Sequence, residues 1–139
     1  MEKQQGRVDV RRMTILTVMA LAVSTFIAVG PLSAEVQGDA KAGKEKYLTL
    51  CASCHGTSGK GDGPAAAALN PKPRDHTNGK YMNTLTDQYL FSVIKEGGKA
   101  VGLSELMPPW GRALNDKEIR DLVAYVRTLA VPPYKPPRK

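Results

Sequence analysis

The stretch Cys51-Ala52-Ser53-Cys54-His55 decides the fold of this chain, and its chemistry follows from the spacing of three side chains. Two thiols one helical turn apart suit the two vinyl groups of one haem, to which each thiol adds as a thioether. The imidazole of His55 is then held at the iron, where a neutral ring nitrogen is a good axial ligand. Gly56 has no side chain, so we expect the backbone there to pass close to the macrocycle. The motif predicts one covalent haem c, attached through Cys51 and Cys54.

Three other uses of the two cysteines fit the sequence less well. A redox-active disulfide of the thioredoxin kind needs a βαβ unit, and no segment has the pattern of a strand. A zinc site needs more ligands, but the chain has two cysteines and only one histidine besides His55, namely His76. Free structural thiols are unusual in an oxidising compartment, where the N-terminal segment places this chain. The haem interpretation is therefore preferred.

Length and composition agree with a small domain built around a cofactor. The chain has 139 residues, a length typical of one domain. Its 42% hydrophobic and 24% charged residues are those of a globular protein and exclude wholesale disorder. Only 6% of residues are aromatic, so a core made of side chains alone would be thin. We expect the flat apolar haem to serve as the centre of packing.

Residues 1–34 have the composition of a secretory signal peptide. Four basic residues precede an uncharged and mostly apolar run over 13–29, and the small residues Ser33 and Ala34 follow it. We expect cleavage after Ala34 and export to the periplasm. The alternative is an uncleaved anchor on the outer face of the cytoplasmic membrane, because a run of this length is at the short limit of the ~17–25 residues that span a bilayer. Membrane contact is expected only in that second case.

The charge of residues 35–139 points to a protein partner. This part keeps 16 Lys and Arg against 11 Asp and Glu. The basic residues are scattered without a long run, which argues against nucleic-acid binding. Dispersed positive charge instead suits docking to redox partners with acidic surfaces. Lys60, Lys72 and Lys99 are candidates for orienting such a partner.

Caps and apolar periodicity predict helices and no strands. The expected helices are one over 40–50 with Asp39 as its cap, a short one over 65–69, one that begins within 84–87 and ends at Gly97, and one that begins at Asn115 and ends before Pro132. Residues 132–139 form a tail rich in Pro, Lys and Arg, which we expect to be stiff, extended and unpacked. The fold class is therefore all-α.

The best candidate for the sixth iron ligand is Met107. It precedes Pro108-Pro109-Trp110-Gly111, and a residue before proline is biased toward extended backbone. The two prolines stiffen the loop and reduce the entropy lost on holding the thioether in place. Met82 and His76 are weaker candidates, and the latter would give a bis-histidine iron. Met107 as a mere core filler is the remaining alternative.

Over residues 36–131 the sequence resembles the class I c-type cytochromes, a family with one haem. The attachment motif matches at Cys51, Cys54 and His55, and the ligand loop matches at Met107 in a Met-Pro-Pro-Trp-Gly form. Gly43, Tyr47 and Tyr125 match the positions at which the first and last helices cross in that family. The resemblance implies the small all-α cytochrome c fold, three to four helices around the haem with crossed terminal helices, for a domain over 35–131.

The same resemblance implies a function. Class I cytochromes carry single electrons between respiratory redox partners in the periplasm. Ligands on both sides of the iron leave no vacant position, so we expect no enzyme activity. For the haem propionates we consider Lys72, Arg74 and Trp110 as contacts, with Tyr47 as a further donor. Two alternatives remain: a membrane-anchored haem subunit of a respiratory complex, and a haem enzyme or gas-binding protein in which Met107 is displaceable.

Overall fold

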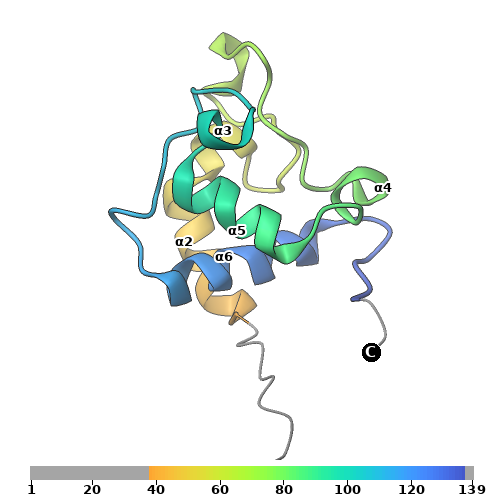
Figure 1. Ribbon diagram of the computed structural model, residues 1–139. Coiled ribbons are helices and arrows are strands. Elements are labelled where there is room, and N and C mark those ends of the chain that lie inside the picture. Colours follow the sequence, from red (N-terminus) through yellow and green to blue (C-terminus); the bar gives the residue numbers. More distant parts are fainter. Residues whose placement is uncertain (1–37, 137–139) are drawn as a thin grey trace, which may run out of the picture. The chain divides into compact units, whose positions relative to one another are not determined.

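The computed structural model describes residues 38–136 and shows a helical domain (Figure 1). The predictions for residues 1–34 lie outside the described residues, as do the last three residues of the tail. The α-helices are α2 (Ala40–Leu50), α3 (Ala52–His55), α4 (Gly79–Met82), α5 (Asp87–Glu96) and α6 (Asp116–Leu129), and the 3-10 helices are η1 (Ala66–Ala68) and η2 (Lys99–Val101). Within 38–136 the only β pairing is an isolated bridge between Asn78 and Val131. The all-α prediction is confirmed.

The three long helices begin where their caps predict. Asp39 accepts the amide hydrogen of Lys41 at 2.8 Å, which satisfies a free donor at the start of α2. Within the predicted start of α5, at 84–87, Thr86 is the cap, since its side chain accepts from the amide of Tyr89 at 3.1 Å. At the start of α6, Asn115 and Glu118 each bond the other's backbone amide, which completes a capping box.

The short helices were predicted less well. The expected helix over 65–69 is only the single 3-10 turn η1, whose path is limited by the prolines after it. Helices α3 and α4 were not predicted as helices, because an element of four residues is too short to show a period. The start of α4 is fixed locally by Asn78, whose side chain accepts from the amide of Tyr81 at 3.2 Å.

Helices α2 and α6 cross in close contact, as the resemblance implies (Figure 1). A Cβ atom at Gly43 would collide with the carbonyl oxygen of Asp121, so the crossing requires glycine at this position. Next to it, the rings of Tyr47 and Tyr125 meet edge to face with centroids 5.1 Å apart. Such pairs contribute about 0.5–1.5 kcal/mol beyond the area that they bury.

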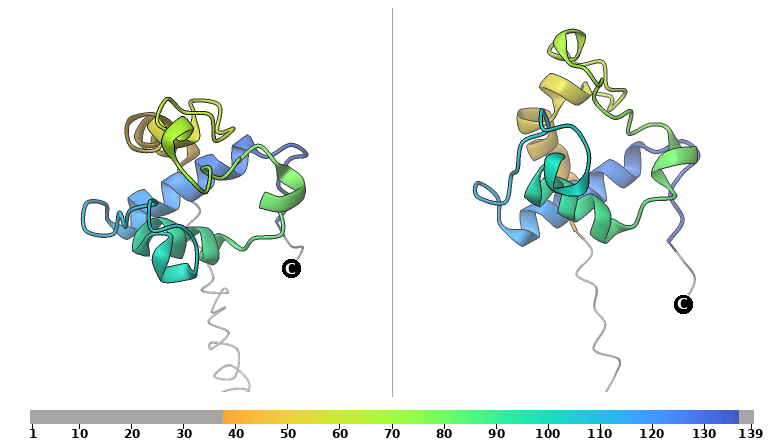
Figure 2. Two further views of the ribbon diagram at one scale, coloured as in Figure 1. Left: turned by 90° about the horizontal axis from the view of Figure 1, so that it is seen from above. Right: turned by 45° about the horizontal axis from the view of Figure 1, so that its top comes forward.

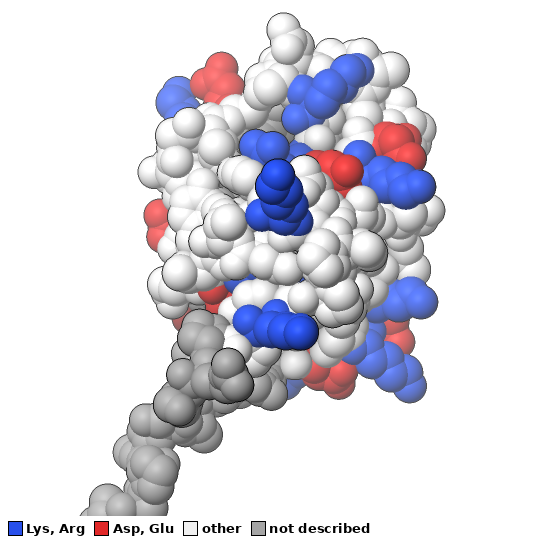
Figure 3. Space-filling model, turned by 90° about the vertical axis from the view of Figure 1, so that its right-hand side faces the viewer, with Lys and Arg blue, Asp and Glu red and all other residues white. Residues whose placement is uncertain are grey.

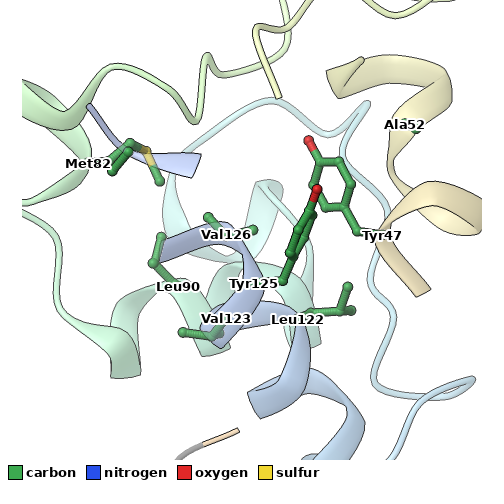
Figure 4. Packing of buried hydrophobic residues seen from close by; sticks show 9 residues of the cluster. Tyr47, Ala52, Met82, Leu90, Leu122, Val123, Tyr125 and Val126 are labelled. Carbon is green, nitrogen blue, oxygen red and sulfur yellow. The ribbon is translucent and has the colours of Figure 1, made fainter. Parts of the chain in front are cut away.

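A small apolar cluster covers the side of α6 that faces the rest of the domain (Figure 4). Its largest fully buried side chains are those of Tyr47, Met82 and Leu122, which come from α2, α4 and α6. Burying a side chain of this size contributes about 1.5–3 kcal/mol. The cluster thus joins elements from both ends of the domain, and several of its members also form the wall of the site described below.

Arg127 connects α6 to the segment between α4 and α5. It is 8% exposed, and its guanidinium donates to the carbonyls of Met82 at 2.7 Å and Leu85 at 2.6 Å and to Asp87 Oδ1 at 2.7 Å. Its Cζ lies over the ring of Tyr134, 3.9 Å from the centroid. The beginning of the tail is therefore packed against α6, contrary to our expectation of an unpacked tail, because an aromatic side chain finds a cation there.

Asp121 is predicted to make folding sensitive to acid. Its buried carboxylate accepts from the amide of Asp39 and from Lys117 Nζ, both at 2.8 Å, and so ties α6 to the start of α2. Burial raises the pKa of the Asp121 carboxyl, but these two hydrogen bonds outweigh it and the net pKa lies below its ordinary value. A depressed native pKa gives stability that is present above the ordinary value and is lost as the pH falls through the native one.

We therefore expect Asp121→Asn to lower the free energy of unfolding at pH 7 by about 1.5–3 kcal/mol, the worth of a hydrogen bond to a charged group. As the pH falls below about 4 the difference from the wild type should shrink, since Asp121 of the unfolded chain is protonated before the native carboxylate is. Urea unfolding of both proteins at pH 7 and pH 3 measures this. An equal difference at both pH values would contradict the prediction.

Candidate haem site

A largely apolar cavity of about 470 Å³ lies between the helices. It is lined by α2, α3 and α4, the segment 69–76, α5, the loop 103–110 and α6. In the view from above, the α3–η1 segment and α5 lie on either side of α6 (Figure 2). Cys51, Cys54, His55 and Met107 all line this one cavity, and so do the three residues predicted to contact propionates.

The attachment motif is shaped by the junction of α2 and α3. The amide of Cys51 still bonds to the carbonyl of Tyr47 at 2.9 Å, and the amide of His55 bonds to the carbonyl of Cys51 at 2.9 Å. Cys51 and Cys54 are therefore separated by one helical turn, as the haem interpretation requires, and both are half-buried at the cavity. Burial, and then the neighbouring Cys54, raises the pKa of the Cys51 thiol to about 11.

The backbone conformation at Gly56 favours glycine, and its approach to the macrocycle stays a prediction. Its φ of 77° lies in the region that favours glycine, and a Cβ atom would collide with Oδ1 of Asp62. The loop that follows α3 thus turns back beneath the motif, with the amide of Gly61 bonded to the carbonyl of His55 at 2.8 Å. The positive φ at this turn, which sequence alone does not show, is therefore the main reason for glycine here.

The imidazole of His55 is held in one tautomer. Its Nδ1 lies 3.0 Å from the carbonyl oxygen of Arg74, which can only accept, so Nδ1 carries the hydrogen and Nε2 keeps its lone pair. Burial lowers the pKa of His55, and the bond to Arg74 opposes this only in part. A neutral ring with a free Nε2 is the form in which histidine ligates iron, and a bond from its other nitrogen typically orients such a ligand.

His76 lies beside His55, and this position does not fit the bis-histidine alternative. The two rings are stacked, with centroids 4.3 Å apart and planes at 17°. Two ligands on opposite faces of one haem would point at each other end to end and not lie face to face. Burial and the nearby His55 lower the pKa of His76 to about 3, so its ring is neutral. Its Nδ1 lies 3.2 Å from the hydroxyl of Tyr47.

This contact also changes the interpretation of Tyr47. Burial is the main reason why the pKa of its hydroxyl is raised, so the hydroxyl stays protonated, and it is hydrogen-bonded to Nδ1 of His76. Tyr47 is 1% exposed. It therefore supports His76 at the helix crossing and also lines the cavity, and its contact with a propionate stays a prediction.

Backbone bonds hold the loop of Met107 against the end of α5. The amide of Gly98 donates to the carbonyl of Met107 at 2.9 Å, and the amide of Trp110 donates to the carbonyl of Ile94 at 3.0 Å. Met107 is half-buried and lines the cavity. Met82 lines it too, but this side chain is 2% exposed and belongs to the apolar cluster.

The predicted propionate contacts all reach the cavity, and two of them have protein partners. Lys72 Nζ donates to the carbonyls of Ala66 at 2.8 Å and Ala67 at 3.0 Å, and the guanidinium of Arg74 lies 4.4 Å from the ring centroid of Tyr81. Trp110 is half-buried at the rim. We keep Lys72, Arg74 and Trp110 as proposed contacts.

The three lysines suggested for docking differ in whether they line the cavity and in whether they form an ion pair. Lys72 lines the cavity, whereas Lys60 and Lys99 do not. Lys99 is paired with Glu105 at 3.1 Å on the surface. On the face drawn in Figure 3, Lys and Arg side chains are spread widely with fewer acidic ones among them. This agrees with dispersed positive charge and not with one compact basic patch.

Sequence reasoning missed two parts of the site. The stacking of His76 and the carbonyl of Arg74 as partner of His55 both depend on how the segment 69–76 returns to α3. The only available signal was His76 itself, the second histidine of a chain with a haem motif.

The site fits a covalent haem: an apolar cavity, two thiols one turn apart, a neutral imidazole and a thioether lie around the same space. Comparison with known proteins agrees. The protein-family model described as cytochrome c oxidase, cbb3-type, subunit III matches residues 38–126. The chain belongs to this family and is a class I c-type cytochrome. It carries a single haem c, bound covalently, and it is an electron-transfer protein that interacts with redox partners.

Individual relatives cover this cytochrome to different extents. Cytochrome c-554(547) of Halothiobacillus neapolitanus is 33% identical over 66% of this chain and 98% of its own length. The cbb3-type cytochrome c oxidase subunit FixP of Azorhizobium caulinodans is 32% identical over 73% of this chain, which spans only 32% of FixP. The solved structure of the KustC0563 c-type cytochrome aligns with a TM-score of 0.53 and 26% identity over 63% of this chain and 96% of that one. Among the helices of residues 38–136, none is both long and apolar enough for a membrane span.

Proposed function

We propose that this cytochrome is a periplasmic single-electron carrier in which Cys51 and Cys54 bind the haem and His55 and Met107 ligate its iron. The observation that carries the proposal is the convergence of these four side chains on one apolar cavity. The relative cytochrome c-554(547), which has nearly the same extent as the domain, supports a protein that acts by itself.

The residues of the chain account for carrier behaviour in three ways. His55 presents Nε2 because Arg74 holds its other nitrogen, and the Met107 loop is kept in place by α5. When bound, haem c supplies an iron that takes up and releases one electron. Leu90, Val93 and Leu122 give the cavity an apolar lining, which would disfavour the more highly charged ferric state of a bound haem and raise its potential. With both axial positions filled by side chains, substrate chemistry at the metal is disfavoured, so we propose a carrier and not an enzyme.

A second candidate is a haem subunit held in a respiratory complex. The similarity to FixP and the family description favour it, together with the predicted apolar run over 13–29. In either case we propose that acidic surfaces of the redox partners meet the dispersed positive charge of residues 35–139.

Intact mass, N-terminal sequence and spectrum of the native protein test the proposal. We expect one haem per chain, Glu35 as the first residue, and a red sulfur-to-iron band in the oxidised state. An intact Met1 would instead support the anchored subunit. High-spin features with ready carbon monoxide binding would support the gas-binding or enzyme alternative. A native chain with no Soret absorption would overturn all three.

A further inference from the structure

Two contacts restrain the His55 ring, and they restrain different motions. The bond from Nδ1 to the carbonyl of Arg74, at 3.0 Å, fixes the direction in which the ring points. By itself it leaves the ring plane free to turn about the line of that bond. The flat face of His76, stacked at 4.3 Å and within 17° of parallel, opposes this turning, because rotation would drive the ring edge into its neighbour.

His76 is itself held firmly enough to act as a reference plane. Its amide bonds to the carbonyl of Gly59 at 2.7 Å. The next residue, Thr77, is tied to the carboxylate of Asp75 through both its amide, at 2.8 Å, and its hydroxyl, at 2.6 Å. The ring is then fixed by the hydroxyl of Tyr47, 3.2 Å from Nδ1.

Tyr47 connects this arrangement to the crossing of α2 and α6. Its side chain is 1% exposed and packs edge to face against Tyr125 where α2 crosses α6. Three stacked or bonded rings therefore lead from the helix crossing to the proposed iron ligand, in the order Tyr47, His76 and His55.

We propose that Tyr47 and His76 are positioning residues that set the plane of the His55 ring and thereby tune the iron. This inference rests on the proposed role of His55 as an axial ligand. The plane of an imidazole determines which iron d orbitals its π system meets, so turning the ring changes the spacing of those orbitals. Contacts behind a ligand are known to tune metal sites in this way.

Two variants of His76 test whether the flat ring of this residue, and not only its volume, orients the ring of His55. His76→Phe keeps a flat ring against His55, whereas His76→Leu keeps apolar volume without a plane. In the ferric low-spin protein we expect His76→Leu to shift the largest g value in electron paramagnetic resonance and to shift the midpoint potential. His76→Phe should shift both by less. If His76→Leu only lowers stability and leaves both readouts unchanged, the positioning role is wrong.

The hydroxyl of Tyr47 gives a second test that needs no large change in packing. Tyr47→Phe should shift the g value in the same direction as His76→Leu, and this effect should vanish in a His76→Phe background, where the hydroxyl has no partner. Tyr125→Phe is the matched control from the same crossing and should leave the spectrum unchanged. Equal effects of Tyr47→Phe in both backgrounds would overturn the proposed order of contacts.

Failure of this inference is distinguishable from failure of the proposed function. If His55 and Met107 are not the ligands, the wild-type ferric protein lacks the red sulfur-to-iron band. If the ligands are right but the inference is wrong, the wild type shows that band and the variants of His76 and Tyr47 match its g values and potential. If His76→Leu fails to incorporate haem, the positioning role is tested by comparing the g-value shift caused by Tyr47→Phe in the wild type with that in the His76→Phe variant.

Discussion

Met107→Leu is expected to keep covalent haem but to lose the red sulfur-to-iron band and to lower the midpoint potential by on the order of 0.2 V, within the ~0.8 V range that axial ligands span. The reason is that a neutral thioether favours the ferrous state, and leucine offers no donor atom. The opened position should also bind carbon monoxide readily. Visible spectra and a redox titration of the purified variant measure all three effects.

Met82→Leu is the matched control, because the other methionine of the domain lines the same cavity. We expect this variant to retain the band and a potential near that of the wild type. The opposite result, with the band lost in Met82→Leu and kept in Met107→Leu, would show that the sulfur ligand lies on α4. Such an outcome would leave the haem attachment and the fold untouched.

The double variant Cys51→Ala/Cys54→Ala is expected to reach the periplasm without covalent haem and largely unfolded. The cavity of about 470 Å³ is lined mostly by apolar side chains, and without haem these lose the group that fills it. Core substitutions that remove far less volume already cost about 2–5 kcal/mol, which is comparable with the ~5–15 kcal/mol by which domains are stable. Intact mass shows the loss of haem, and far-ultraviolet circular dichroism shows the loss of helix.

Ser53→Ala is the control for that experiment, since it changes the same turn, at an exposed residue, but keeps both thiols. It should carry one haem and have the helical content of the wild type. A haem-free double variant with wild-type helix content and a cooperative thermal transition would contradict the prediction. It would mean that side chains such as Tyr47 and Leu122 make a sufficient core by themselves.

The features that sequence could predict are those that depend on residues close together in the chain. The thioether pair and its histidine occupy five consecutive positions, so spacing alone identifies the cofactor. Caps act within three residues, and for that reason Asp39 and Asn115 placed the starts of α2 and α6 correctly. The crossing at Gly43 came instead from the family resemblance, which already contains tertiary information.

Tertiary structure alone decided how the site is supported. Tyr47 and His76 are 29 positions apart, and no local pattern indicates that they meet. The same holds for the carbonyl of Arg74, 19 positions from His55, because any backbone carbonyl can accept and only the returning chain selects one. The sequence by itself thus determined which cofactor this cytochrome binds and where its long helices lie. The fold decided which groups hold the ligand ring, since these contacts exist only after distant segments have packed.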